Sequence, residues 1–316
     1  MKFAGTLAGA LIALTAVTAH ADEKTVAGIV FSQLEYFRAF QTGMESAATA
    51  ASGAVLMGNS DAKPEKEASL IDTYISSGVG AIVISPVSDK GSVAALQRAA
   101  DAGIKVVLYN SPLAADFPVA SIVSSDKDIG ESTGKEAAKF ITEKLGGKAN
   151  VALLGFKSLL PEQSDGRTNG FLAPVQAAGD IKIVAQQDGW TPEKAVAVAS
   201  DILTANPDIN IIYAANEGGT VGAVQAVKQA GLQGKVFVFG TDGSEQLVNF
   251  IKEENPVLLA TTAQQPVEIG KAAYEAARKA IAGEPVEKVV AVPVLPLSIS
   301  DPAGLDAYLA AIAAYK

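Results

Sequence analysis

"NVALLGFKSLLPEQSDGRTNGF", residues 150–171, joins a short apolar run to a polar segment with an arginine near its centre. The run at 150–155 is continuously apolar, which is typical of a strand buried on both faces of a sheet. Only four of the 25 basic residues are arginines, and Arg167 lies in the polar segment that follows this strand. We therefore predict that Arg167 lies beyond the carboxyl end of a buried strand, where a ligand is bound; a surface or helix-capping arginine is the alternative.

The same alternation of a short apolar run with a longer amphipathic stretch repeats along the chain. In "KEASLIDTYISSG", residues 66–78, Leu70, Tyr74 and Ile75 recur at helical spacing, and Gly78 follows where a helix should end. Strand, helix and strand in succession predict parallel sheets covered by helices on both faces. The predicted strands are residues 25–31, 54–58, 80–85, 105–109, 119–123, 150–155, 181–186, 209–215, 235–240, 257–263 and 288–294.

Eleven strands are too many for one sheet in a chain of 316 residues, so we predict two α/β domains. No segment rich in proline or serine separates them. The expected crossing is "IVSSDKDIG", residues 122–130, where a strand is followed by a polar turn and a new helix begins. A connection this short predicts two closely juxtaposed domains.

The amino terminus, "MKFAGTLAGALIALTAVTAHADEK", has the pattern of a secretory signal peptide. Lys2 precedes an apolar stretch that runs to Val17, and Ala19-His20-Ala21 fits a cleavage site with small residues. No cysteine follows, which excludes a lipid anchor at that position. We expect residues 1–21 to be removed and a soluble chain to be exported.

The composition excludes several kinds of chemistry. The chain has no cysteine, and its one histidine, His20, lies in the segment expected to be removed. Cysteine nucleophiles, Ser-His-Asp triads, zinc sites and disulfides are therefore excluded from the mature chain. The net charge of −9 argues against nucleic acid and anionic membranes as partners. We expect no catalytic residue, no cofactor and no metal.

Unusual polar and aromatic residues follow the predicted strands. Ligands of parallel sheets bind beyond the carboxyl ends of the strands. Amide, guanidinium and carboxylate groups can each pair with sugar hydroxyls, and aromatic rings can stack on the CH faces of a sugar. Structural roles are the alternative, as a core aromatic for Trp190 and as a turn or helix cap for Asn216 and Asp242. The candidate ligand-binding residues are Tyr36, Phe37, Tyr109, Asn110, Arg167, Trp190, Asn216, Asp242 and Gln264.

Several of these segments, taken in order, resemble a known family. They are "VFSQLEYF" (30–37), "SSDKDIG" (124–130), "GRTNGF" (166–171), "ANEGGTVGA" (215–223), "VFGTDGSEQ" (238–246) and "ATTAQQPVEIG" (260–270). The chain is similar to the ribose-binding type of periplasmic sugar-binding protein, a type I periplasmic binding protein that feeds an ABC transporter. The resemblance implies two doubly wound, Rossmann-like parallel-sheet lobes, joined by a three-segment hinge, with the ligand in the cleft between them. The implied lobes are residues 22–125 with 265–295, and residues 126–264 with 296–316.

The resemblance also implies roles for the candidate residues. Tyr36 and Phe37 would sandwich the sugar with Trp190 of the other lobe. The hydroxyl-binding residues would be Arg167, Asn216, Asp242 and Gln264.

One pair departs from the family pattern. Tyr109 and Asn110 stand where ribose binders carry an Asp-Arg pair, so we expect a neutral monosaccharide or sugar alcohol other than ribose. Either Gln33 or Glu35 is expected to face the ligand.

The implied partner is a membrane permease, the implied location is the periplasm, and a monomer is expected. Two alternatives stay open at this point. One is a ligand-sensing protein that docks on a chemoreceptor or a sensor kinase. The other is an exported carbohydrate-processing enzyme, for which Glu35 and Asp242 would be a conceivable carboxylate pair.

Overall fold

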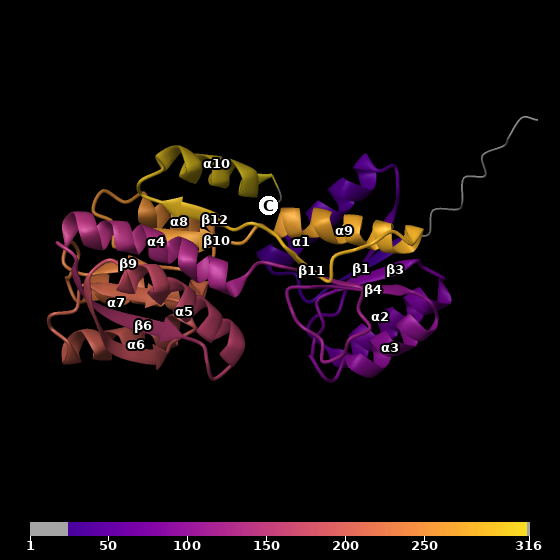
Figure 1. The fold of residues 1–316 in the computed structure, drawn as a ribbon, viewed down its shortest axis with the longest axis horizontal. Helices are drawn as coiled ribbons and strands as arrows, with labels where there is room; N and C mark the ends of the chain where they lie inside the picture. Colours follow the sequence, from indigo (N-terminus) through magenta and orange to yellow (C-terminus); the bar gives the residue numbers. More distant parts are fainter. Residues whose placement is uncertain (1–24, 315–316) are drawn as a thin grey trace, which may run out of the picture.

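The computed structural model describes residues 25–314, which form two α/β lobes side by side (Figure 1). Each lobe is built on one six-stranded sheet, and all neighbouring strands are parallel except one pair. The predicted fold of two mostly parallel lobes is therefore confirmed. The expected signal peptide lies outside the described residues. Among residues 25–314, no helix combines the length and the apolar character that a membrane span requires.

The amino-terminal lobe has the strand order β11-β5-β4-β3-β1-β2, with every pair parallel. Its central strands at 26–30 and 81–84 are fully buried because helices cover both faces, whereas the two edge strands are partly exposed. The strands are β1 (Val26–Val30), β2 (Val55–Asn59), β3 (Ala81–Ile84), β4 (Lys105–Tyr109), β5 (Ala120–Val123) and β11 (Val289–Ala291). The helices are α1 (Glu35–Ala50), α2 (Pro64–Ser76), α3 (Val93–Asp101) and α9 (Pro266–Ala282).

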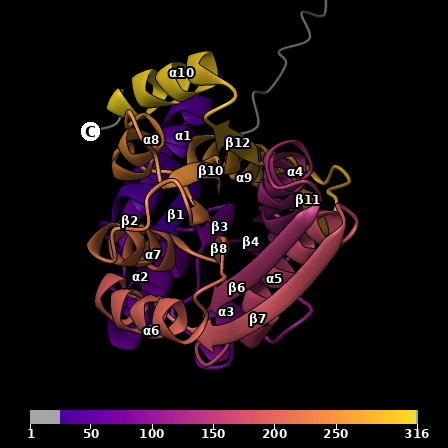
Figure 2. The same ribbon diagram turned by 90° about the vertical axis from the view of Figure 1, so that its left-hand side faces the viewer.

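The carboxyl-terminal lobe repeats this order as β12-β10-β9-β8-β6-β7, and only β12 is antiparallel to its neighbour. Figure 2 shows α4 and α5 on one side of this sheet and α6 and α7 on the other. The strands are β6 (Lys148–Gly155), β7 (Asp180–Asp188), β8 (Ile211–Ala214), β9 (Phe237–Phe239), β10 (Leu258–Ala263) and β12 (Leu295–Ser298). The helices are α4 (Asp126–Lys144), α5 (Pro161–Gln176), α6 (Pro192–Ala205), α7 (Glu217–Gln229), α8 (Glu245–Ile251) and α10 (Pro302–Ala313).

The chain crosses between the lobes three times. It passes from β5 to α4, from β10 to α9, and from β11 to β12. The last crossing leads into β12, which is the one described strand that the sequence did not predict. Pro296 lies in β12, at the edge of the sheet, where a missing backbone N–H is tolerated.

Close packing of α4 against α5 sets the position of Arg167. A Cβ atom on Gly130 of α4 would lie 1.9 Å from the backbone oxygen of Arg167 in α5. Only glycine allows this approach, so the two helices are in backbone contact at this point. Arg167 is therefore held close to the start of α4, directly after the first crossing.

Each lobe contains a stacked pair of aromatic rings between a helix and the sheet, at α1 in the first lobe and at α5 in the second. The rings of Phe40 and Tyr109 have centroids 3.5 Å apart, and those of Phe171 and Tyr213 are 4.0 Å apart. Residues four positions apart lie on the same face of a helix. Tyr36 therefore lies above Phe40 in α1, and Arg167 lies above Phe171 in α5, so that both approach the carboxyl ends of their strands.

Candidate binding site between the lobes

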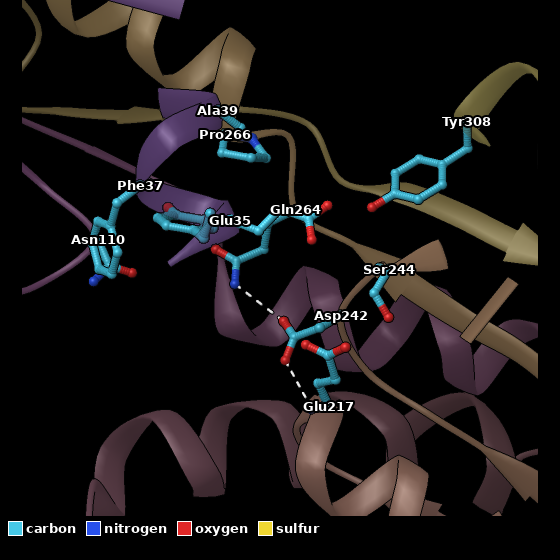
Figure 3. Close-up of a pocket in the computed structure, with 12 residues that line it drawn as sticks. Glu35, Phe37, Ala39, Asn110, Glu217, Asp242, Ser244, Gln264, Pro266 and Tyr308 are labelled. Atoms are coloured by element: carbon cyan, nitrogen blue, oxygen red, sulfur yellow. Dashed lines mark hydrogen bonds between the residues drawn. The ribbon is translucent and has the colours of Figure 1, made fainter. Parts of the chain in front are cut away.

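A cavity of about 310 Å³ lies between the two lobes, and we call it the main cavity. It opens at the carboxyl ends of strands from both sheets, which is the usual ligand position in this kind of fold. The amino-terminal lobe and the second crossing contribute Glu35, Tyr36, Phe37, Ala39, Asn110, Gln264 and Pro266. The other lobe contributes Glu217, Asp242, Gly243, Ser244 and Tyr308 (Figure 3).

A second cavity of about 310 Å³ lies on the hinge side, and we call it the hinge-side cavity. Its lining is largely polar and comes from the first crossing and from the start of α5. Asn110 and Gln264 line both cavities, so the two spaces meet at these side chains. The lining residues are Asn110, Pro112, Ser121, Val123, Ser124, Ser125, Asp126, Glu162, Gln163, Arg167 and Gln264.

Tyr36 and Phe37 form an aromatic wall on the first turn of α1. Their ring centroids lie 5.2 Å apart at an interplanar angle of 83°. The Tyr36 hydroxyl is buried and meets no hydrogen-bond partner among residues 25–314. Burial raises the pKa of Tyr36, and the Asp242 carboxylate across the cleft raises it further, while Arg167 opposes this. A neutral phenol facing the main cavity can donate to, or accept from, a bound hydroxyl.

Tyr109 does not reach either cavity. Its side chain is fully buried, stacks on Phe40 and donates a hydrogen bond of 3.4 Å to the backbone oxygen of Ile29. Burial raises the pKa of the phenol well above its ordinary value. Phe37 lies edge-on to this ring with a centroid distance of 6.4 Å. Tyr109 therefore packs against Phe37 of the aromatic wall from the core side.

Asn110 turns toward the cavities because its backbone is left-handed, with φ at 58°. Asparagine tolerates this conformation better than most residues. Its Nδ2 atom donates to Ser85 Oγ and to Ser111 Oγ, both at 3.3 Å. The amide oxygen of Asn110 can accept a hydrogen bond from a ligand.

Arg167 is buried, with 8% of the residue exposed, and a network of oxygens holds its guanidinium. Its Nε donates to Asp126 Oδ1 at 2.9 Å, and its Nη1 donates to the backbone oxygen of Ala215 at 3.0 Å. Nη1 also lies 3.8 Å from Asp242 Oδ1. Burial lowers the pKa of Arg167, but Asp242 and Asp126 outweigh burial and raise it. Burial raises the pKa of Asp126, although Arg167 opposes this shift.

Asp242 ties the start of α7 to the second crossing through its side chain. Its Oδ2 accepts from the backbone N–H of Glu217 at 3.0 Å, and its Oδ1 accepts from Gln264 Nε2 at 3.3 Å (Figure 3). Its backbone has φ at 73°, which aspartate tolerates in a turn. Asp242 therefore occupies a turn, which was the alternative to ligand binding in the sequence analysis, and it also lines the main cavity.

Trp190 and Asn216 lie outside the lining of both cavities. Trp190 is partly buried and packs against the core under α4 and α5. Asn216 caps α7, where its Oδ1 accepts from the N–H of Gly219 at 3.1 Å. Its Nδ2 donates to the backbone oxygen of Trp190 at 2.8 Å. Their contacts with a ligand stay predictions.

Several residues that line the cavities were not among the candidates, and five of them carry polar side chains that matter for the site: Glu35, Asp126, Glu217, Ser244 and Tyr308. Glu35 faces the main cavity, whereas Gln33 is exposed and lines neither space. Asp126 and Glu217 each follow a predicted strand closely, so the strand-end argument could have found them. Ser244 follows the predicted strand at 235–240 in the same way, whereas Tyr308 carries no such signal because it comes from α10.

The Glu217 carboxyl is half-buried, and nearby groups shift its pKa. Burial raises its pKa, the hydrogen bond with the Ser244 side chain lowers it, and Asp242 and Glu35 raise it. The main cavity thus presents carboxylates, amides and a hydroxyl beside aromatic rings. This arrangement suits a small molecule that offers several hydroxyl groups and apolar CH faces.

Comparison with known proteins places the chain among bacterial binding proteins. A family model described as the periplasmic binding protein domain matches residues 28–285. The ABC transporter periplasmic-binding protein YphF of Escherichia coli strain K12 is 29% identical over 290 residues, which cover 89% of this chain and 88% of that protein. The ribose import binding protein RbsB of Bacillus subtilis strain 168 is 30% identical over 259 residues, which cover 82% and 81%.

Solved structures agree with this assignment. A periplasmic solute-binding protein of an ABC transporter from Actinobacillus succinogenes 130z, with bound D-allose, has a TM-score of 0.76 and 29% identity. The match covers 88% of this chain and 98% of that one. A periplasmic ribose ABC transporter protein from Conexibacter woesei has a TM-score of 0.80 at 21% identity, covers 91% and 95%, and supports the fold alone.

Proposed function

The chain belongs to the periplasmic binding protein domain family, and from this premise we propose that it captures a neutral monosaccharide or sugar alcohol between its lobes. The bound form then delivers the ligand to the membrane permease of an ABC transporter. Relatives named as ribose-import and D-allose-binding proteins support this class of ligand. The signal-peptide pattern at residues 1–21 supports export to the periplasm.

The main cavity carries this proposal. Its two walls belong to different lobes, with Tyr36 and Phe37 on one side and Asp242 on the other. The buried Tyr36 hydroxyl lacks a partner among the described residues, and a ligand hydroxyl in the cavity would supply one. The aromatic wall suits the apolar face of the same ligand.

Ligand contacts on both lobes give the protein a means of signalling occupancy. A ligand that touches both walls binds the closed arrangement more tightly than the open one and shifts the population toward it. We take the three crossings as the hinge, with residues 22–125 and 265–295 moving against residues 126–264 and 296–316. A permease can then distinguish loaded from empty protein by the relative position of the lobes.

Binding without chemistry is the simplest reading of the residues in the cleft. The curated relatives reported above are named as binding proteins. The mature chain expected from the sequence carries neither the histidine nor the cysteine that would serve as a base or nucleophile near neutral pH. We therefore propose that the protein releases its ligand unchanged.

A thermal-shift screen tests the proposed function. The mature protein is heated with pentoses, hexoses, tetritols, pentitols and hexitols, each at a concentration well above the expected Kd. A ligand present at about 100 times its Kd adds about 2.7 kcal/mol of stability, which is a clear rise in melting temperature. The variant Asp242→Asn keeps the left-handed backbone and should lose most of the shift. The proposed function is wrong if no sugar or sugar alcohol stabilises the protein.

A further inference from the structure

The carboxyl-terminal helix α10 is fixed firmly to the second lobe. The Asp301 side chain caps it by accepting from the N–H of Gly304 at 3.0 Å. Leu305 and Ile312 are each only 2% exposed, and Leu305 belongs to the core of this lobe. Asp306 forms an ion pair with Lys252 at the end of α8. The position of α10 is therefore set by its own packing and not by a ligand.

Tyr308 of α10 reaches from this helix to the main cavity. A Cβ atom on Gly243 would lie 2.5 Å from the Tyr308 hydroxyl oxygen and 2.9 Å from Cζ. The phenol therefore lies directly on the backbone of the turn that carries Asp242, and a larger residue at 243 would displace it. Figure 3 shows its hydroxyl pointing toward the middle of the cavity.

The main cavity has two ends with different residues. In Figure 3, Asn110 and Tyr308 lie at opposite sides, with Gln264 and Asp242 between them. A ligand ring that stacked on Phe37 and paired with Asp242 and Gln264 would fill the part of the cavity between Asn110 and Asp242. We call the remaining part, lined by Glu217, Ser244 and Tyr308, the far end.

The far end is built for a hydroxyl group. The Glu217 carboxyl and the Ser244 side chain line the cavity beside each other (Figure 3), and the backbone N–H of Glu217 donates to Asp242 Oδ2 at 3.0 Å. A carboxylate oxygen accepts more than one hydrogen bond, so Glu217 can also accept from a ligand hydroxyl. An apolar group placed there would desolvate the carboxyl without giving it a partner, which is unfavourable.

We propose that the far end binds the sixth, hydroxyl-bearing carbon of the ligand and that Tyr308 is a specificity-determining residue. The ligand is then a six-carbon sugar or sugar alcohol, and its five-carbon analogue binds less well because the far end stays unfilled. The proposal rests on the proposed function and narrows it. It assigns to α10 a role in ligand selection that the strand-end residues do not have.

Matched ligand pairs test the proposal by calorimetry. D-ribose and D-allose, D-xylose and D-glucose, and L-arabinose and D-galactose differ, as pyranoses, by one hydroxymethyl group; xylitol and sorbitol differ by one hydroxyl-bearing carbon. For the pair that binds, we expect the six-carbon member to bind at least about tenfold more tightly to the wild type. In Tyr308→Ala and in Glu217→Gln the ratio of the two affinities should fall to about threefold or less, because the six-carbon member loses more affinity than the five-carbon member.

Leu309→Ala is the matched control on the same helix. Leu309 packs against the core of the lobe and does not line the main cavity, so this variant loosens α10 and should keep the affinity ratio. Melting temperatures of all the variants verify that they fold. Loss of the ratio in Leu309→Ala to the same extent as in Tyr308→Ala would overturn the proposal, because helix docking would then explain the effect.

Two further outcomes separate the inference from the proposed function. If the five-carbon member binds as tightly as the six-carbon member, or the ratio survives Tyr308→Ala and Glu217→Gln, the far end has no such role, while saturable binding still supports the proposed function. If no sugar or sugar alcohol binds in these pairs or in the wider screen, the proposed function fails and this inference fails with it.

Discussion

Arg167 Nη1 lies 3.8 Å from Asp242 Oδ1, and the Nε of the same guanidinium donates to Asp126 Oδ1 at 2.9 Å. Asp126 begins α4 directly after the first crossing between the lobes, and Asp242 follows β9 in the wall of the main cavity. Arg167 thus links the hinge to the binding site through two carboxylates. A change at Arg167 should affect the fold as well as the ligand.

We predict that Arg167→Ala lowers the free energy of unfolding by about 3–5 kcal/mol, because it leaves two partly buried carboxylates without their cation. This loss of stability comes from the two ion pairs and is separate from any effect on ligand affinity. Urea denaturation measures it. Lys135→Ala, which removes only an exposed ion pair with Glu131, is the control and should change stability by less than about 1 kcal/mol. Wild-type stability in Arg167→Ala would contradict the role given to this network.

We predict that Tyr109→Phe binds the ligand as the wild type does, because the Tyr109 hydroxyl contacts backbone and not the main cavity. Tyr109→Asp should fail to fold, since it places a carboxylate in the core against Phe40. Introducing the Asp-Arg pair of ribose binders at 109–110 is therefore not a clean test of specificity. Circular dichroism and calorimetry on the two variants check this. A large loss of affinity in folded Tyr109→Phe would show that the hydroxyl acts on the ligand.

We predict that Glu217→Gln is more stable than the wild type at neutral pH. The pKa of Glu217 is raised in the folded protein, so the stability linked to its proton is fully present below the ordinary value of 4.5 and is lost as pH rises through the raised pKa. Glutamine stays neutral, so its advantage should appear near pH 7 and vanish below about pH 4.5.

Urea denaturation of both proteins at several pH values between about 4 and 7 measures this difference. A Glu217→Gln variant that is less stable than the wild type at pH 7 would show that the ionised carboxyl is stabilising, contrary to this account.

We predict that saturation with the ligand changes the emission of Trp190, the only tryptophan of the chain. Trp190 is partly buried, and its backbone oxygen accepts a hydrogen bond from Asn216 at the start of α7. The next residue, Glu217, lines the far end of the main cavity. Closure of the lobes should therefore alter its surroundings. A fluorescence titration with a ligand confirmed by calorimetry gives the result. An unchanged spectrum at saturation would assign Trp190 to the core of its lobe and remove it from the predicted ligand-binding residues.

The sequence predicted the two-lobe fold because parallel strands buried on both faces are continuous apolar runs that alternate with helices. It missed β12, whose four residues include Pro296. The sequence could place residues near the strand ends but could not show whether each side chain points into the core or into the cleft. Tyr109 turns inward and Asn110 outward because of one left-handed backbone position. Tyr308 could not be predicted, since its place depends on how α10 packs against the lobe.

Calorimetric titration of the wild type and of one variant from each wall of the main cavity tests the central claim most directly. With the tightest sugar or sugar alcohol from the screen, we predict one site per chain. Phe37→Ala in the first lobe and Asp242→Asn in the second should each weaken binding by about tenfold or more while melting as folded proteins. Wild-type affinity in both folded variants would show that the ligand is not held between the two lobes.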